Sequence, residues 1–395
     1  MAPILIGLGV AELDAIRVTA IANNAPVSYG ALGVPIIALA TVTGLPLLAL
    51  SASVGKVVAL LALLPPWVLI YLVSGRRGFA DGWPLAVVGS LAYILGQLPV
   101  SQFVGPYLPD ITGSLVSFGL LLALLRVWRP RTLLGYGGRE LDAEAAARFE
   151  AVPVSRAAAW RAWLPFIILI VVVVLWTGPW SPLPGLSLMA LKAAAVSSIS
   201  HKATSVAFSF TPFAGGTSIL VSWLLMLAVL RPGAAAVREV FRTTFRQMWG
   251  ALLVGFLIFG LADVFNLSGM AASLAYTFSR IGPAFIVLAP VLGWIGVALS
   301  GSNTSTNAMF GLMQTLVGKL LGFPALLLPS LNSVGAEVGK PIAPQTASVG
   351  VATTRFVPSE GQVIRHNLGW TLVLLAWLII VGLLYYTVAP GVMRL

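Results

Sequence analysis

The sequence predicts an all-α polytopic membrane protein with roughly ten to twelve transmembrane or re-entrant helical segments. Of its 395 residues, 58% are apolar and only 9% are charged. The apolar residues also gather in runs that repeatedly approach the roughly 20 residues an α-helix needs to cross a bilayer. A third observation is that short polar segments with glycine and proline interrupt these runs, which predicts hairpin loops and broken helices among the spans.

Ten apolar runs are the candidate spans, and a polar connector divides them into two groups. The connector covers residues 129–161 and separates a first transport half, 1–128, from a second, 162–395. Its charges of both signs favour a solvated connector, with an amphipathic helix as the alternative. The predicted spans lie at residues 35–50, 54–74, 83–103, 108–127, 163–180, 210–230, 249–265, 281–300, 307–328 and 369–388.

The net charge of +11 indicates how the chain is oriented in the membrane, rather than binding to a polyanion such as nucleic acid. Most of the 23 basic residues fall between spans, at 75–81, 126–161, 231–246 and 355–365. Short basic loops that flank apolar spans follow the positive-inside rule, so the first three segments are expected on the cytoplasmic side. We therefore expect a multi-pass protein of the lipid bilayer that does not bind nucleic acid.

The sequence gives little support for an enzyme active site or a metal site. Cysteine is absent, and the two histidines, His201 and His366, are far apart with no metal-ligand spacing. No paired acid and base, and no nucleophile with its base, stands at usable spacing. We expect no cofactor and no metal, and a membrane enzyme is the least favoured function.

Two polar segments near the C-terminal end form the candidate solute site. Uncharged hydroxyls and amides at membrane depth are tolerated where non-helical backbone lines a cavity enclosed by protein. Such groups, together with the N-termini of broken helices, can replace the water around a small carboxylate. The candidate substrate-binding residues of these segments are Ser302, Asn303, Thr304, Ser305, Thr306, Asn307, Asn332, Ser333, Lys340 and Gln345.

Two of these assignments have structural alternatives. The residues of 302–307 could instead cap a helix in an extracellular loop, because hydroxyl and amide side chains are preferred at caps. Lys340, between Gly339 and Pro341, could pair with a substrate carboxylate or could extend its ammonium group to the membrane interface.

A weak internal repeat predicts a partner for this site. Residues 23–35 read NNAPVSYGALGVP and residues 332–344 read NSVGAEVGKPIAP, with the asparagine, a glycine and the last proline in register. Inverted-repeat transporters place such interrupted segments together near the bilayer midplane. Pro26 and Gly30 would keep the first copy non-helical, although a kinked helix packed by small residues is the alternative. Its candidate site residues are Asn23, Asn24, Ser28 and Tyr29.

At these motifs the chain resembles the lactate permease family, bacterial carriers of lactate and related 2-hydroxy monocarboxylates such as glycolate. The resemblance rests on GSNTSTNAMFG at 301–311, NSVGAEVGKPIAPQ at 332–345, NNAPVSYGALGVP at 23–35, GPYLPDITGSLVS at 105–117 and NLSGM at 266–270. It implies a secondary active carrier of a small carboxylate in the bacterial cytoplasmic (inner) membrane, with proton symport and an inverted-repeat fold.

The chain departs from the family in three ways. Asn303 stands where aspartate is usual, and Glu337 stands where an apolar residue is usual. Family members also have further spans upstream of the position of Met1, so we expect the chain to begin inside its first repeat. The alternatives are a sodium-coupled carboxylate or dicarboxylate carrier and a transport-incompetent fragment; the sequence predicts neither stoichiometry nor oligomeric state.

Two acidic residues are candidates for proton coupling. Glu337 and Asp263 are the carboxyl groups expected at membrane depth. A carboxyl group buried among apolar residues takes up a proton more readily than one in water, which can couple solute movement to a proton gradient. The alternative is that either residue forms an ion pair with Lys340 or Arg280.

Overall fold

The structure is a computed structural model that describes residues 1–24, 27–141, 155–196, 203–352, 354 and 359–395. Pro26, His201 and residues 142–154 of the predicted connector lie outside the described residues. The chain divides into two compact units: unit 1 comprises Met1–Ala151 and Ala275–Leu395, and unit 2 comprises Val152–Leu274. These boundaries differ from those of the two transport halves, whose assignment stays a prediction.

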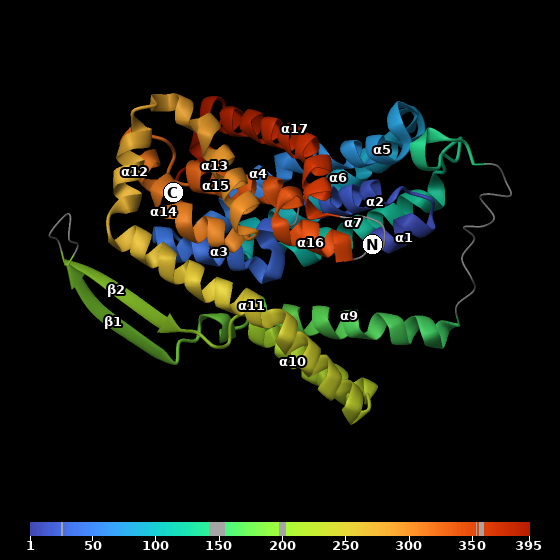
Figure 1. The fold of residues 1–395 in the computed structure, drawn as a ribbon, viewed down its shortest axis with the longest axis horizontal. Helices are drawn as coiled ribbons and strands as arrows, with labels where there is room; N and C mark the ends of the chain where they lie inside the picture. The colour runs from blue at the N-terminus through green and yellow to red at the C-terminus, as the bar shows by residue number, and fades with distance from the viewer. Residues whose placement is uncertain (25–26, 142–154, 197–202, 353, 355–358) are drawn as a thin grey trace. The chain divides into compact units, whose positions relative to one another are not determined.

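Unit 1 is helical and holds every element of the candidate site (Figure 1). Short 3-10 helices join several of its α-helices, at η1 (Val27–Tyr29), η2 (Gly75–Arg77), η3 (Tyr136–Gly138) and η6 (Lys340–Ile342). Its α-helices are α1 (Ala2–Gly7), α2 (Glu12–Ala22), α3 (Gly30–Thr43), α4 (Leu47–Leu61), α5 (Pro65–Ser74), α6 (Gly78–Phe103), α7 (Pro109–Val127), α13 (Phe285–Ser300), α14 (Asn303–Leu321), α15 (Leu327–Gly339), α16 (Pro344–Ala352) and α17 (Glu360–Thr387).

Close packing of α13 on α15 forms the centre of unit 1, where the two helices lie side by side (Figure 1). Every residue of α15 is buried. Glycines make this approach possible: a Cβ atom on Gly335 would lie 2.2 Å from the carbonyl oxygen of Pro290, and one on Gly293 would lie 2.1 Å from that of Asn332. Small residues allow such backbone contact between membrane helices.

Glycine and proline divide the first predicted spans more finely than the apolar runs suggest. The predicted span 35–50 is wrong, because α3 ends at Thr43 and is capped by Gly44 at φ 68°. The span 54–74 is also wrong: α4 ends at Leu61, and α5 begins at Pro65. A proline fits the first turn of a helix but interrupts its interior, so a continuous apolar run here contains a helix boundary.

The described residues contain enough long apolar helix for a polytopic membrane protein. Six helical stretches can cross a membrane by length and composition, and a seventh can if the bent pair Glu12–Ala22 and Val27–Thr43, which turns by 64°, is one span. The chain is therefore an all-α polytopic membrane protein, as its composition predicts. The six stretches are Leu47–Phe103, Pro109–Val127, Arg156–Thr177, Ala234–Leu267, Gly282–Ser300 and Glu360–Thr387.

Unit 2 contains a β-hairpin that the pattern of apolar runs did not predict. Strands β1 (Met189–Val196) and β2 (Ala203–Phe210) pair antiparallel, with Met189 opposite Phe210. The sequence of β2, ATSVAFSF, places polar and apolar residues alternately near its end, which is the period of a strand rather than a helix. The helices α9 (Arg156–Thr177), α10 (Gly215–Leu230), α11 (Ala234–Leu267) and α12 (Met270–Ser279, which extends into unit 1) complete the main elements.

Candidate functional site

A buried hairpin turn joins α13 to α14 in the first polar segment. Gly301, at φ 71°, ends α13, and Ser302 caps α14 by accepting a hydrogen bond from the backbone N–H of Ser305 at 3.3 Å. The Thr306 hydroxyl donates to the Ser302 carbonyl at 2.9 Å. The capping alternative therefore holds for Ser302. The turn is not an exposed loop, because Gly301, Ser305 and Thr306 are buried and Thr304 is half-buried.

Asn307, Asn332 and Ser333 form a buried hydrogen-bond network inside unit 1. The Asn307 amide donates to the Ser333 hydroxyl at 2.9 Å and to the Pro35 carbonyl at 3.0 Å. Its oxygen accepts from the Asn332 amide at 3.1 Å, and Gln314 donates to the Asn332 oxygen at 3.4 Å. These predicted substrate-binding residues thus use their polar groups to join α3, α14 and α15.

Two other asparagines are buried without such partners. Asn303, at the start of α14, is 4% exposed, and Asn24, just after α2, is 1% exposed. Neither amide nitrogen nor amide oxygen of either residue has a hydrogen-bond partner among the described residues. Burying an amide unpaired costs about 1–3 kcal/mol per group, so such groups in a native fold call for an explanation.

An open cavity of about 470 Å³ brings both predicted copies of the repeat together. Asn23 lines it from the end of α2, and Lys340 and Gln345 line it from η6 and α16. Lys340 donates from Nζ to the Gly301 carbonyl at 2.5 Å, and the Gln345 side chain lies against Gly301. The cavity therefore adjoins the α13–α14 turn at Gly301. Its volume falls in the range of small-molecule sites.

Glu337 is fully buried and links α15 to η1. Its Oε2 accepts a hydrogen bond from the Ser28 backbone N–H at 3.1 Å and another from the Ser28 hydroxyl. Its Oε1 has no hydrogen-bond partner among the described residues. The predicted alternative, an ion pair with Lys340 or Arg280, is absent from the described ion pairs, since Lys340 binds Gly301 and Arg280 lies 5.5 Å from the centre of the Tyr276 ring.

Strained backbone follows Ser28. Ala31 and Leu32 have φ angles of 48° and 58°, and Gly33 continues the left-handed turn at 73°. Left-handed φ angles cost non-glycine residues about 1–3 kcal/mol each and persist only where the surroundings enforce them. A Cβ atom on Gly33 would lie 2.4 Å from the Pro106 carbonyl oxygen, so only glycine fits at this contact. The interrupted segment is thus held between Glu337 and the α6–α7 connection.

Neither Tyr29 nor Asp263 lines the cavity. The buried Tyr29 hydroxyl donates to the Ser51 carbonyl of α4 at 2.6 Å. Asp263 is exposed on α11 in unit 2. Of the two carboxyl groups expected for proton coupling, only Glu337 is buried within unit 1.

Sequence reasoning missed a polar cluster between α6 and α7. The Tyr93 hydroxyl donates to Asp110 at 3.3 Å, and the buried amide of Gln97 has no hydrogen-bond partner among the described residues. Asp110 stands in the first turn of α7, inside the motif GPYLPDITGSLVS. An acidic residue in the first turn of an apolar span was the available signal, since intramembrane carboxyl groups are functional candidates.

Comparison with known proteins assigns the family. The sequence profile of L-lactate permease matches residues 1–390. Glycolate permease GlcA of Escherichia coli (strain K12) is 33% identical over 99% of this chain and 74% of its own length. The L-lactate permease of Bacillus subtilis (strain 168) is 32% identical over 98% of this chain and 74% of its own length.

Among solved structures, the Alcanivorax borkumensis YdaH transporter is 18% identical, covers 98% of this chain and 88% of its own, and has a TM-score of 0.37. That similarity is too low to assign a fold. The profile match over nearly the whole chain and the sequence identity to both permeases are decisive. The chain belongs to the L-lactate permease family.

Proposed function

We propose that this chain carries lactate or a related 2-hydroxy monocarboxylate such as glycolate across the bacterial cytoplasmic membrane, in symport with a proton. Its relatives are an L-lactate permease and a glycolate permease. The observation that carries the proposal is the cavity where Lys340, Gln345 and Asn23 meet beside the α13–α14 turn. It combines the Lys340 cation with neutral donors, which suits a small carboxylate.

The carboxylate binds Lys340 in this proposal. A lysine has three N–H donors, and the bond to Gly301 uses one of them. The amides of Gln345 and Asn23 offer further donors at the same cavity. The unpaired amide of Asn303 binds the substrate hydroxyl or carboxylate when the solute moves inward to the turn, which accounts for its burial without a partner.

Glu337 carries the coupled proton. A buried carboxylate without a cation is costly, and a bound proton removes that cost. Because Ser28 holds one oxygen of Glu337 and precedes the strained turn of residues 31–33, a change in protonation alters the contact between α15 and the interrupted segment. Proton loading and rearrangement of the site are thereby linked.

Uptake of labelled lactate and glycolate into proteoliposomes tests the proposal. An imposed pH gradient, with the outside acidic, should drive accumulation of the labelled solute inside the proteoliposomes. A sodium gradient without a pH gradient should not. Accumulation that follows sodium alone would support the sodium-coupled alternative. No accumulation or exchange of either solute by correctly folded protein would contradict carriage of these substrates.

The variant Glu337→Gln separates coupling from carriage. It should abolish proton-driven accumulation while solute exchange continues, because the neutral amide cannot release a proton. The matched control is Asp263→Asn, which removes the exposed carboxyl group of the other candidate and should leave accumulation unchanged. Normal accumulation by Glu337→Gln would exclude Glu337 as the proton carrier.

A further inference from the structure

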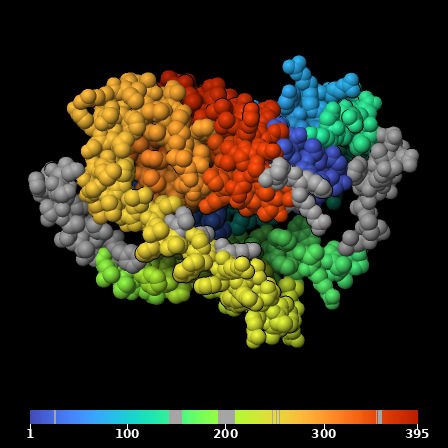
Figure 2. Space-filling view, viewed as in Figure 1, coloured from blue at the N-terminus to red at the C-terminus, as the bar shows by residue number. Residues whose placement is uncertain are grey.

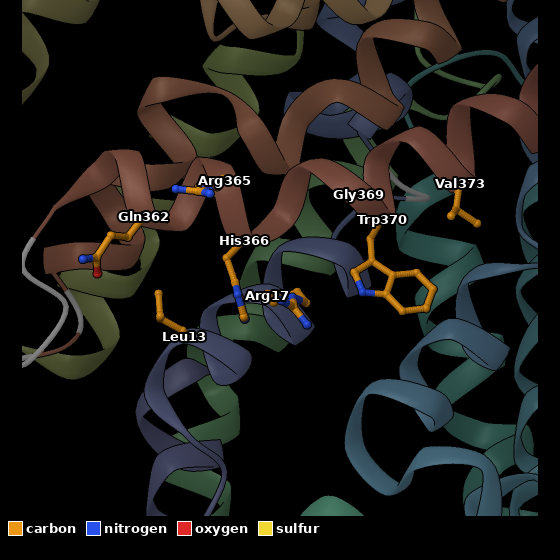
Figure 3. Close-up of a pocket in the computed structure, with 8 residues that line it drawn as sticks. All are labelled: Leu13, Arg17, Gln362, Arg365, His366, Gly369, Trp370 and Val373. Carbon is orange, nitrogen blue, oxygen red and sulfur yellow. The ribbon is translucent and has the colours of Figure 1, made fainter.

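A second cavity, of about 760 Å³, lies in a groove between α2 and α17 and shares no lining residue with the candidate site. We call it the α2–α17 groove. Figure 3 shows Gln362, His366, Trp370 and Val373 following one another along one side of α17, with Arg17 contributed by α2. Spacings of three and four residues place side chains on the same helix face, so the groove has a defined wall.

One end of the groove is cationic. Arg17, Arg365 and His366 line it. Asp14 is the carboxylate beside them, at 3.2 Å from Arg17 and 2.8 Å from His366. Among the described residues, the buried Nε of Arg17 has no hydrogen-bond partner and the exposed Arg365 has no acidic partner. Positive charge thus exceeds negative charge at this end, which favours an anion.

The same end lies beside the basic connections of unit 1. The Tyr136 hydroxyl of η3 donates a hydrogen bond to Asp14, and this bond raises the pKa of Tyr136 to about 12. A Cβ atom on Gly138 would lie 2.6 Å from the Ser74 carbonyl oxygen, which places η3 against the segment that carries Arg76 and Arg77. Basic residues gather at the ends of membrane spans, where the lipid headgroups lie.

Along α17 the wall changes from polar to apolar. Gln362, Arg365 and His366 are followed by Gly369, Trp370 and Val373. The Trp370 ring lies 5.5 Å from that of Tyr71 on α5, as expected of aromatic residues at a membrane interface. Beyond it, Val373 is 45% exposed and Ile380, two turns on, is 52% exposed. The space-filling view shows α17, in red, reaching the surface (Figure 2).

We propose that the α2–α17 groove binds one anionic phospholipid. Its phosphate group lies among Arg17, Arg365 and His366, and an acyl chain runs along Trp370 and Val373 toward Ile380. A free phosphate would use only the cationic end, whereas a lipid uses both the cationic end and the apolar wall that continues from it. Basic pockets between membrane helices recognise lipid headgroups by this combination of charge and apolar surface.

Native mass spectrometry of the purified full-length chain tests this proposal, because it counts the lipid molecules that stay bound to each protein molecule. Phosphatidylglycerol should bind in a one-to-one complex, and phosphatidylcholine, whose headgroup has no net charge, should bind at least fivefold more weakly. Inorganic phosphate should not displace phosphatidylglycerol at equal concentration. Equal retention of the two lipids, or displacement by inorganic phosphate, would overturn the lipid assignment.

Variants locate the lipid. Arg365→Gln should weaken phosphatidylglycerol binding about fivefold, the effect of one arginine near a membrane surface. Arg394→Gln removes an exposed arginine outside the groove and should leave binding unchanged. Val373→Ser should weaken phosphatidylglycerol and phosphatidylcholine alike, because it shortens the apolar wall. Unchanged binding by both Arg365→Gln and Val373→Ser would place the lipid elsewhere.

Discussion

Two pairs of buried asparagines in unit 1 have the same chemistry and opposite surroundings. Asn307 and Asn332 bond to each other and to neighbouring groups on α3 and α14. Asn24 and Asn303 are also buried, yet none of their amide atoms has a partner among the described residues. The first pair lies within packed helices, whereas the second lies where helices end.

This difference is the basis on which we propose a structural role for the first pair and a solute-binding role for Asn303. A paired amide contributes to folding, because its removal leaves another buried group unsatisfied. An unpaired amide only costs free energy in the absence of a ligand. The solute that we propose to reach the α13–α14 turn would supply a partner for the amide of Asn303. Residue type alone does not distinguish the two roles.

Removing the close approach of α13 and α15 should have the largest effect. Gly335→Ala would place a Cβ atom 2.2 Å from the Pro290 carbonyl oxygen, so the two helices must move apart and disturb the paired asparagines. We expect a loss of about 3 kcal/mol or more, seen as a large fall in the thermal unfolding temperature in detergent.

The matched control is Gly318→Ala in α14, where the nearest atom is 3.6 Å away. Alanine is favoured over glycine in a helix by about 1 kcal/mol, so this variant should be neutral or stabilised. Equal losses in both variants would mean that helix packing at Gly335 is looser than we describe.

Breaking the paired network should have the next largest effect. Asn307→Ala removes the partner of the Asn332 amide and of the Pro35 carbonyl. Leaving such groups buried and unpaired should cost on the order of 3 kcal/mol. We expect a lower unfolding temperature, with the KM for lactate little changed in the protein that remains folded. A large increase in KM with normal stability would assign Asn307 to the substrate.

Neutralising the cation of the cavity should affect transport more than stability. Lys340→Met keeps most of the side-chain volume and removes the bond to the Gly301 carbonyl, worth about 1 kcal/mol. Exchange of labelled lactate should fall at least tenfold, while the unfolding temperature moves by only a few degrees. Normal exchange would favour the alternative in which Lys340 merely reaches the membrane interface.

The sequence predicted where helices are interrupted better than it predicted which residues contact one another. Glycine lies at the end of α13 (Gly301) and at the end of α15 (Gly339), and proline lies at the start of α16 (Pro344). The structure has helix boundaries at all three positions. Backbone preferences of this kind are local, so they can be read from neighbouring residues. The same signals at Gly44 and Pro65 were overlooked because the surrounding run is uniformly apolar.

Pairing between distant residues could not be predicted. Asp14 and His366 are 352 positions apart, and Ser28 and Glu337 are 309 apart. Neither contact has a local pattern, because tertiary packing decides which helix faces meet. For the same reason, the sequence could not separate the paired asparagines from the unpaired ones, or place Tyr93 beside Asp110.

Our central proposal is that the unpaired buried amide of Asn303 binds the solute. Asn303→Ala tests it most directly when the unfolding temperature is measured with and without saturating lactate. We expect the variant to be as stable as the wild type, or up to about 1 kcal/mol more stable, and to lose the rise in unfolding temperature that lactate produces. A variant that is destabilised like Asn307→Ala and keeps the full lactate effect would contradict the account.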